Sequence, residues 1–248
     1  RPPRSTPKPS SAASDVYKRQ VHWAAHGPAP TGENGDASVI IMHAGSDDGV
    51  CAIMPGCSTR KFHSSKRDAF QGINAQPLGT ISVDRNGECQ INMDVHTPTR
   101  DIATGPAAFD EGIRILQLVA GAHLYADQIE LASNYDAILF HGSGLGHLPI
   151  EDPNGDSPEN VAMREAIANY CAKGGTAVMA TQCIHGPVHM DVYSKGREQQ
   201  ELGSIGNHAT TGPDAALVKL HFLLSTKQDI QSGWGANLCG ENASSIIN

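Results

Sequence analysis

Residues 136–147, DAILFHGSGLGH, decide the fold of this chain. A short apolar run, 136–141, passes into a turn with three glycines, and this pattern is typical of a buried strand that ends at the edge of a sheet. The same strand signal recurs on both sides, with helical patterns between the strands. The predicted order is strand 113–119, helix 123–132, strand 136–141, helix 157–172 and strand 176–180. This alternation predicts a parallel sheet with helices on its faces.

The helices of this region carry signals at their ends. Ser157 can cap the second helix, Pro158 suits its first position, and Gly174-Gly175 ends it. A further amphipathic helix is predicted over 213–224, because its apolar residues follow a helical spacing. The sequence therefore predicts one α/β domain over 113–225, followed by a polar and loosely structured tail over 226–248.

The region before this domain is rich in strand signals and poor in helix signals. Strands are predicted at 38–42, 49–54, 59–62, 79–83 and 88–93. The first is an apolar run that indicates a buried parallel strand. Asn86-Gly87 lies between the last two and indicates a hairpin.

These strands have few helices to cover them. We expect 21–37 to be irregular, 21–96 to be a partial N-terminal domain, and 97–112 to be a linker. Apolar strands without a cover expose a large apolar surface, so the sequence also predicts poor solubility.

Residues 1–20 resemble the translation of a transposon-based sequencing adapter, and we expect them to be an artefactual tail outside the fold. They hold five basic residues and one acidic residue, a net charge of +4, whereas the whole chain carries −8. Residues 21–248 therefore carry −12, the difference between the two. Such an acidic surface argues against direct binding of a nucleic-acid backbone by this chain.

Cysteine and histidine spacing predicts neither disulfides nor a metal site. The six cysteines show no CxxC pair, which is typical of the reduced thiols of a cytosolic protein. His185 and His189 are close in sequence, but Pro187 lies between them, and no HExxH or paired Cys/His spacing occurs. No apolar run is long enough to span a bilayer.

A lysine precedes a polar loop in residues 59–79, TRKFHSSKRDAFQGINAQPLG. Burial lowers the pKa of a lysine ammonium, so a desolvated Lys61 at a strand end could accept the proton of a hydroxyl nucleophile. The residues alone leave a second interpretation open. In that interpretation Lys61 is a surface lysine of a basic patch with Arg60, Lys66 and Arg67.

Four segments resemble the asparaginase superfamily. They are HSSKRDAF at 63–70, FHGSGLGHLP at 140–149, ATQCIHGPVHMDVYSKGRE at 180–198 and PDAALVKL at 213–220. Within the superfamily they are most similar to the D subunits of archaeal glutamyl-tRNA(Gln) amidotransferases. The resemblance implies an asparaginase-like α/β fold, in which a truncated N-terminal α/β domain precedes a Rossmann-like domain with a parallel sheet.

The resemblance also implies a function. It implies a cytoplasmic subunit that hydrolyses glutamine and passes the ammonia to an E-type subunit, which would bind the tRNA and amidate its misacylated glutamate. ATP and Mg²⁺ are expected on that partner, and no cofactor is expected here. The family's dimers imply a homodimer. Lys61 takes the catalytic role by this resemblance, and Ser143 and His147 lie at the substrate or at the dimer border.

The nucleophile of the family is missing from this chain. The Thr-Gly-Gly-Thr turn is absent, and so is the family's second threonine with its aspartate neighbour. We therefore expect this chain to be an inactive fragment of an amidohydrolase.

Three other functions remain open from the sequence. One is a free-standing L-asparaginase or glutaminase. The second is a cysteine hydrolase that uses Cys183 at a strand end, although the residue lacks the flanking glycines of a nucleophile elbow and is predicted to be a buried apolar residue instead. The third is a noncatalytic interaction module.

Overall fold

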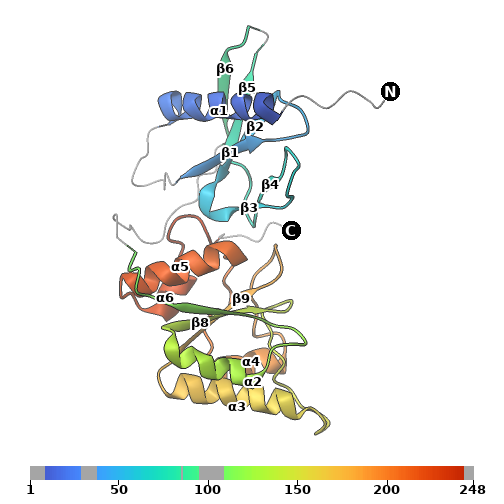
Figure 1. Cartoon of the computed structure of the whole chain (residues 1–248), viewed down its shortest axis with the longest axis vertical. Coiled ribbons are helices and arrows are strands. Elements are labelled where there is room, and N and C mark those ends of the chain that lie inside the picture. The colour runs from blue at the N-terminus through green and yellow to red at the C-terminus, as the bar shows by residue number, and fades with distance from the viewer. Residues whose placement is uncertain (1–8, 29–37, 85, 95–108, 243–248) are drawn as a thin grey trace. The chain divides into compact units, whose positions relative to one another are not determined.

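The computed structural model describes residues 9–28, 38–84, 86–94 and 109–242 (Figure 1). The chain divides into two compact units, residues 1–100 and residues 101–248. Most of the predicted linker, 97–112, lies outside the described residues. No helix within the described ranges combines the length and the apolar character that crossing a membrane requires.

Unit 2 is built on the predicted parallel sheet. Its strands are β7 (Ile115–Val119), β8 (Ala137–Gly142) and β9 (Thr176–Thr181). They pair in parallel in the order β7-β8-β9, which confirms the alternation of strands and helices.

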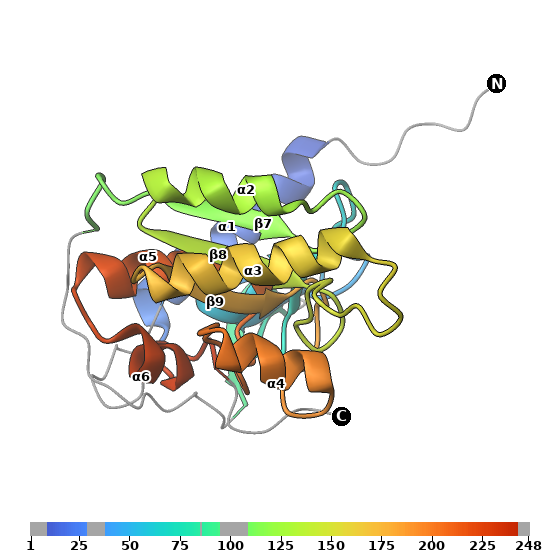
Figure 2. The ribbon, with the colours of Figure 1, turned by 90° about the horizontal axis from the view of Figure 1, so that it is seen from below.

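Helices lie on both faces of this sheet (Figure 1). One face carries α2 (Ala126–Glu130), which continues into η2 (Leu131–Asn134), and α3 (Pro158–Ala172). The other face carries α5 (Pro213–Ser225) and α6 (Ile230–Gly235). Figure 2 is seen from the side of α2 and α3 and shows both helices in front of the sheet. The predicted helices at 123–132, 157–172 and 213–224 are confirmed within a few residues at their ends.

Strand β8 supplies side chains to two separate cores, because successive residues of a strand point to opposite faces. Ile138 and Phe140 belong to the core beneath α2 and α3. Ala137 and Leu139 belong to the core beneath α5 and α6, where they join Leu220. These four side chains of the strand are fully buried, which explains why this part of the sequence is a continuous apolar run.

Two helices of unit 2 are absent from the prediction. Helix α4 (Ser194–Glu201) has the sequence SKGREQQE and no apolar spacing. Helix α6 lies in the segment predicted to be a loose tail. That prediction is wrong for 226–242, because Trp234 is 1% exposed and Glu241 forms a buried ion pair with Lys219 of α5.

The sheet of unit 1 is antiparallel throughout. Its order is β1 (Val39–His43), β2 (Val50–Pro55), β5 (Gly79–Val83) and β6 (Cys89–Met93). The prediction of a parallel strand at 38–42 is therefore wrong. The short segment 44–49 can close a hairpin between β1 and β2, whereas a parallel connection needs about a dozen residues or more. The predicted hairpin at Asn86-Gly87 is confirmed, with Gly87 at φ +85°.

Helix α1 (Pro9–His26) packs on this sheet and corrects two expectations. Residues 1–20 do not all lie outside the fold, and 21–37 is not irregular throughout. Val16 joins a core with Ile41 and Ile81, and the buried Arg19 donates hydrogen bonds to the carbonyls of Asp48 and Gly49. The sheet needs an apolar cover on this face, and α1 supplies it.

A small hairpin follows β2. The one-turn 3₁₀ helix η1 (Gly56–Ser58) leads into β3 (Thr59–Lys61), which pairs antiparallel with β4 (Phe70–Gly72). The predicted strand at 59–62 is confirmed. This hairpin carries Lys61 and the loop 62–69.

Candidate functional site

Lys61 is the last residue of β3 and lies opposite Phe70 of β4. Its side chain is exposed, and its Nζ lies 5.8 Å from the centroid of the Phe70 ring. A lysine that acts as a base must lose much of its hydration, since burial is what lowers its pKa. The described residues of unit 1 do not supply that burial.

The loop after Lys61 is anchored at both sides. The backbone N–H of Phe62 donates to the Ala69 carbonyl at 2.6 Å, which extends the hairpin by one bond. Arg67 forms an ion pair with Asp48 in the β1–β2 turn. Arg67 therefore anchors the loop, and its charge is paired with Asp48 instead of contributing to a basic patch around Lys61.

The glycine-rich turn after β8 folds back on itself. Ser143 and His147 form an isolated antiparallel bridge, and the Ser143 Oγ donates to the His147 carbonyl at 3.2 Å. A Cβ on Gly142 would lie 2.4 Å from the Gly146 carbonyl carbon, so the close return of the chain requires glycine there. Gly146 has φ +93°, in the left-handed region that favours glycine. The glycines are thus needed for the shape of the turn. Ser143, in the same turn, is exposed.

His147 is buried in this turn, with 5% exposure. Burial, and then the positive charge of Lys195, lower the pKa of its imidazole, while Glu151 opposes that shift. The ring meets that of Tyr193 edge to face, with centroids 5.5 Å apart. Its Nε2 has no hydrogen-bond partner among the described residues. His147 is therefore a buried imidazole whose pKa lies below its ordinary value and whose Nε2 is unpartnered among the described residues.

Gln199 of α4 holds this turn in place. Its side chain is fully buried, its Nε2 donates to the Gly146 carbonyl at 2.9 Å, and its Oε1 accepts from the Leu148 N–H at 2.8 Å. This residue is absent from the predicted site residues. No sequence signal could have found it, because Gln199 lies in a polar helix and its partners are more than fifty residues away.

The carboxyl ends of the three strands are tied together at one edge of the sheet. Gln182 Nε2, just after β9, donates to the carbonyls of Ala120 at 2.7 Å and His141 at 3.0 Å. Thr181 donates to the Gly144 carbonyl. Segments that follow three different strands therefore meet here, as is usual for sites in open α/β sheets.

Cys183 follows Gln182 at this edge, and its side chain is exposed. The prediction that it would be a buried apolar residue is wrong. Its N–H donates to the Thr181 Oγ1 at 3.0 Å, directly after β9.

The predicted site residues fall into two groups. Ser143 and His147 lie together in unit 2, at the carboxyl edge of the sheet. Lys61 belongs to unit 1.

This chain is similar in sequence to known proteins. Residues 113–232 match the family profile of the glutaminase/asparaginase C-terminal domain. The chain is 30% identical over 242 residues to the D subunit of glutamyl-tRNA(Gln) amidotransferase from Thermofilum pendens, in a match that covers 96% of this chain and 49% of the relative. The protein of the same name from Saccharolobus solfataricus is 32% identical over 243 residues, with 96% and 50% covered. The chain thus spans about half the length of these curated relatives.

A solved structure shows the same fold. The thermostable L-asparaginase from Thermococcus kodakarensis superposes with a TM-score of 0.70 and 21% sequence identity, over 94% of this chain and 63% of that chain. The predicted asparaginase-like α/β fold is confirmed by this likeness and by the parallel sheet of unit 2. Residues 113–232 therefore match the glutaminase/asparaginase C-terminal domain family.

Proposed function

We propose that this chain is part of the glutamine-hydrolysing subunit of a tRNA-dependent amidotransferase, which converts Glu-tRNA(Gln) to Gln-tRNA(Gln). One observation carries the proposal. Two curated proteins, each named as the D subunit of a glutamyl-tRNA(Gln) amidotransferase, are 30% and 32% identical to the chain across 96% of its length. That span includes both units, and with them the Lys61 hairpin and the turn of Ser143 and His147.

In this proposal Lys61 is the base that activates a threonine hydroxyl. A threonine hydroxyl is a weak nucleophile at neutral pH and needs such a base. Because Lys61 is exposed in unit 1, its desolvation must come from the segment that carries the threonine. The hairpin supplies a fixed position for the amino group at the end of β3.

Ser143 and His147 are proposed to border the substrate or a second protomer. The exposed hydroxyl of Ser143 can hydrogen-bond a polar group that approaches the sheet edge. The imidazole of His147 contacts the Tyr193 ring, and its buried Nε2 has no hydrogen-bond partner among the described residues. A hydroxyl and an imidazole can both hydrogen-bond the side-chain amide of glutamine or asparagine.

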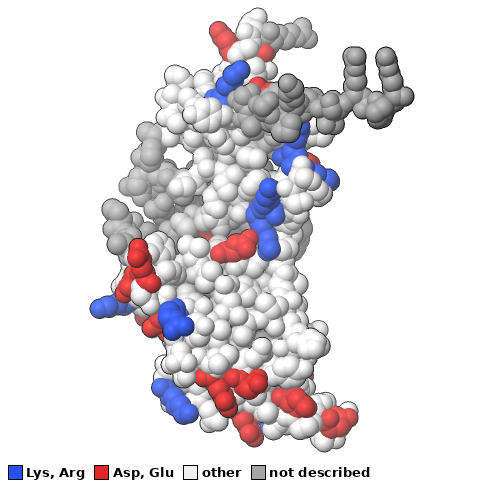
Figure 3. Space-filling view, in the orientation of Figure 1, with Lys and Arg blue, Asp and Glu red and all other residues white. Residues whose placement is uncertain are grey.

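The partners follow from the same proposal. An E-type subunit would bind the tRNA and use ATP and Mg²⁺, while this cytoplasmic subunit would form a homodimer and hold no cofactor. Figure 3 shows acidic side chains gathered over α2 and α3 of unit 2. Their acidic residues are Asp127, Glu130, Glu159 and Glu165. A face of this kind repels a phosphate backbone, which supports contact with the tRNA through the partner.

We further propose that the chain by itself releases no ammonia, because it contains no Thr-Gly-Gly-Thr sequence. Purified chain is to be incubated with glutamine and with asparagine, and ammonia measured beside a Lys61→Met variant. Equal background rates are expected. Release by the unmodified chain above that of the variant would contradict this part of the proposal.

The full proposal is tested with a gene product that contains this chain and the threonine motif. Together with an E-type subunit, ATP and Glu-tRNA(Gln), it should form Gln-tRNA(Gln) from glutamine. A free-standing L-asparaginase is the alternative favoured by the fold likeness to the Thermococcus kodakarensis enzyme. Rapid hydrolysis of asparagine without a partner, and no product on the tRNA, would establish that alternative.

A further inference from the structure

Three side chains of unit 2 converge outside the residues proposed for glutamine hydrolysis. The Asp191 Oδ2 lies 2.9 Å from His208 Nε2 and 4.0 Å from His189 Nδ1. One donor atom from each residue lies within 4.8 Å of the other two. The two imidazole rings meet edge to face, with centroids 5.0 Å apart. Two nitrogens and one oxygen thus surround a single point.

The backbone fixes the two loops that carry these residues. His189 and Asp191 lie between β9 and α4, and His208 lies between α4 and α5. The His208 N–H donates to the Val188 carbonyl at 2.9 Å, and the Met190 N–H donates to Asn207 Oδ1 at 2.7 Å. The residues on either side of His189 are therefore bonded to the loop of His208, which holds the two histidines side by side.

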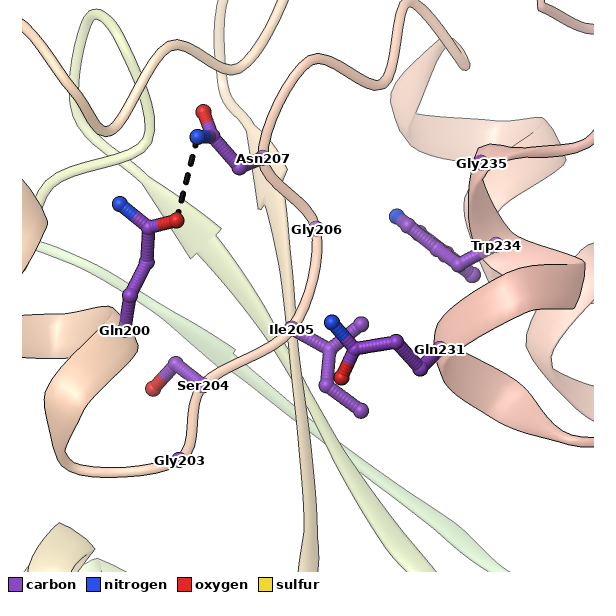
Figure 4. A pocket seen from close by; sticks show the side chains of 9 residues that line it. All are labelled: Gln200, Gly203, Ser204, Ile205, Gly206, Asn207, Gln231, Trp234 and Gly235. Atoms are coloured by element: carbon purple, nitrogen blue, oxygen red, sulfur yellow. Dashed lines mark hydrogen bonds between the residues drawn. The ribbon is translucent and has the colours of Figure 1, made fainter.

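A second layer of hydrogen bonds orients the carboxylate. Asp191 Oδ1 accepts from Asn207 Nδ2 at 2.8 Å and from Gln200 Nε2 at 3.1 Å, so Oδ2 is left to face the imidazoles. Asn207 Nδ2 also donates to Gln200 Oε1 at 3.1 Å, and Figure 4 shows this contact at the wall of a pocket that reaches Trp234. The hydrogen bonds from Asn207 and Gln200 also lower the pKa of Asp191. Supporting contacts of this kind orient the ligands of metal sites.

His189 provides an independent observation. Its Nδ1 is shielded from solvent and has no hydrogen-bond partner among the described residues. At 4.0 Å from Asp191 Oδ2, that nitrogen is too far away for a hydrogen bond. An ion pair between Asp191 and His208 accounts for those two residues but leaves this nitrogen unexplained. A cation between the three groups would account for all of them.

We propose that His189, Asp191 and His208 bind one divalent transition-metal ion, and that Zn²⁺ fits this donor set. Imidazole nitrogens and a carboxylate oxygen are ordinary zinc ligands at about 2.0–2.2 Å, which places neighbouring ligands about 3.3 Å apart in a tetrahedron. The shortest separation here, 2.9 Å, is already near that value. Side-chain rotations that move the donor atoms by about 1–1.5 Å would bring in the third ligand. Water would complete the tetrahedron.

Such an ion would link the β9–α4 loop to the α4–α5 loop, and binding would raise the melting temperature of the folded chain. The site does not depend on the proposed glutamine hydrolysis, and its test does not use that activity.

The experiment titrates the purified full chain, freed of metal with a chelator, with Zn²⁺ in a calorimeter at about pH 7.5. One equivalent should bind, with a rise in melting temperature. Co²⁺ in place of Zn²⁺ should give visible absorption of tetrahedral type. His208→Ala and Asp191→Asn should each weaken binding by about tenfold or more. Asp191→Asn keeps the shape of the side chain, so it remains informative if His208→Ala does not fold.

His185→Ala is the matched control, because His185 is an exposed histidine in the same loop and lies outside the cluster. It should bind Zn²⁺ as tightly as the unmodified chain. The proposal is overturned if the unmodified chain binds no stoichiometric Zn²⁺, or if folded His208→Ala and Asp191→Asn bind it undiminished. It is also overturned if His185→Ala abolishes binding, since that result would place the ion between His185 and His189.

Discussion

The Gln199 side-chain amide of α4 lies 2.9 Å from the Gly146 carbonyl oxygen and closes the turn that holds Ser143 and His147. The same amide accepts the Leu148 N–H, so one buried side chain satisfies two backbone groups on either side of His147. The turn has the Ser143–His147 bridge as its own pairing. The two hydrogen bonds of Gln199, together with the contact of the His147 and Tyr193 rings, fix the position of the turn relative to α4.

Gln199→Leu should lower the free energy of unfolding by about 1–3 kcal/mol for each of the two backbone groups left unpaired. Leucine has a similar volume, so the loss reports the hydrogen bonds more than the packing. Urea denaturation followed by circular dichroism measures it. Glu201→Leu, at an exposed position on the same helix, should change stability by no more than about 0.5 kcal/mol. Equal effects of the two variants would show that the Gln199 amide does not support the turn.

Lys219→Met should destabilise unit 2 by about 3–5 kcal/mol, because it leaves the Glu241 carboxylate buried without its partner. The two side chains are each 2% exposed and lie 2.7 Å apart. A double variant, Lys219→Met with Glu241→Gln, should be more stable than Lys219→Met alone. Thermal and urea unfolding of the three proteins test this. A double variant no more stable than the single one would mean that the carboxylate is not the source of the loss.

The same pair predicts a dependence of stability on pH. Burial by itself would raise the pKa of Glu241, but the charge and hydrogen bond of Lys219 and the backbone N–H groups of Leu238 and Cys239 hold it below the ordinary value of 4.5. As the pH falls, the unfolded chain binds this proton before the folded chain does. The stabilisation by the Glu241 carboxylate is therefore complete above the pKa that this group has in the unfolded chain. It is lost as the pH falls through the lower pKa that the group has in the folded chain.

Unfolding free energies measured between about pH 7 and about pH 3 should show this loss in the unmodified chain and a smaller one in Glu241→Gln. Glu201→Gln, which changes an exposed acid, is the control and should keep the full dependence. Identical pH profiles for the unmodified chain and Glu241→Gln would rule out a contribution from Glu241.

Lys61→Met should lower glutamine hydrolysis by about 10²-fold or more in a gene product that contains this chain and the threonine motif, since a general base contributes about 10²–10⁴-fold. Lys66→Met changes another exposed lysine of the same hairpin and should leave the rate within about twofold of the unmodified value. Ammonia release under saturating glutamine is the measurement. Equal rates for the two variants would remove Lys61 from the mechanism.

Cys183→Ala should leave the hydrolysis rate of that gene product unchanged, although the thiol is exposed at the sheet edge. The proposed chemistry uses a threonine hydroxyl, so no step requires the thiol. Rates measured before and after treatment with iodoacetamide give a second readout that does not rely on the variant. Loss of activity in both experiments would support the cysteine hydrolase instead.

The sequence by itself determined the strands and helices of unit 2 that have clear apolar spacing. The run predicted at 136–141 forms β8 (Ala137–Gly142), because a strand covered on both faces needs an apolar side chain at nearly every position. The helix predicted at 157–172 begins at Pro158 and is followed by Gly174 at φ +87°. The family resemblance of 140–149 and 180–198 likewise lies in local motifs, which a single sequence displays.

Tertiary structure decided whatever depends on partners that are distant in the chain. Antiparallel pairing of β1 and the packing of α1 on the sheet involve surfaces that local spacing does not specify. Gln199 and the cluster of His189, Asp191 and His208 carry no periodic signal, because polar side chains acquire their roles only from the groups that the fold places within about 3–5 Å of them. Apolar periodicity is a property of one segment, whereas a hydrogen bond or a ligand set belongs to several.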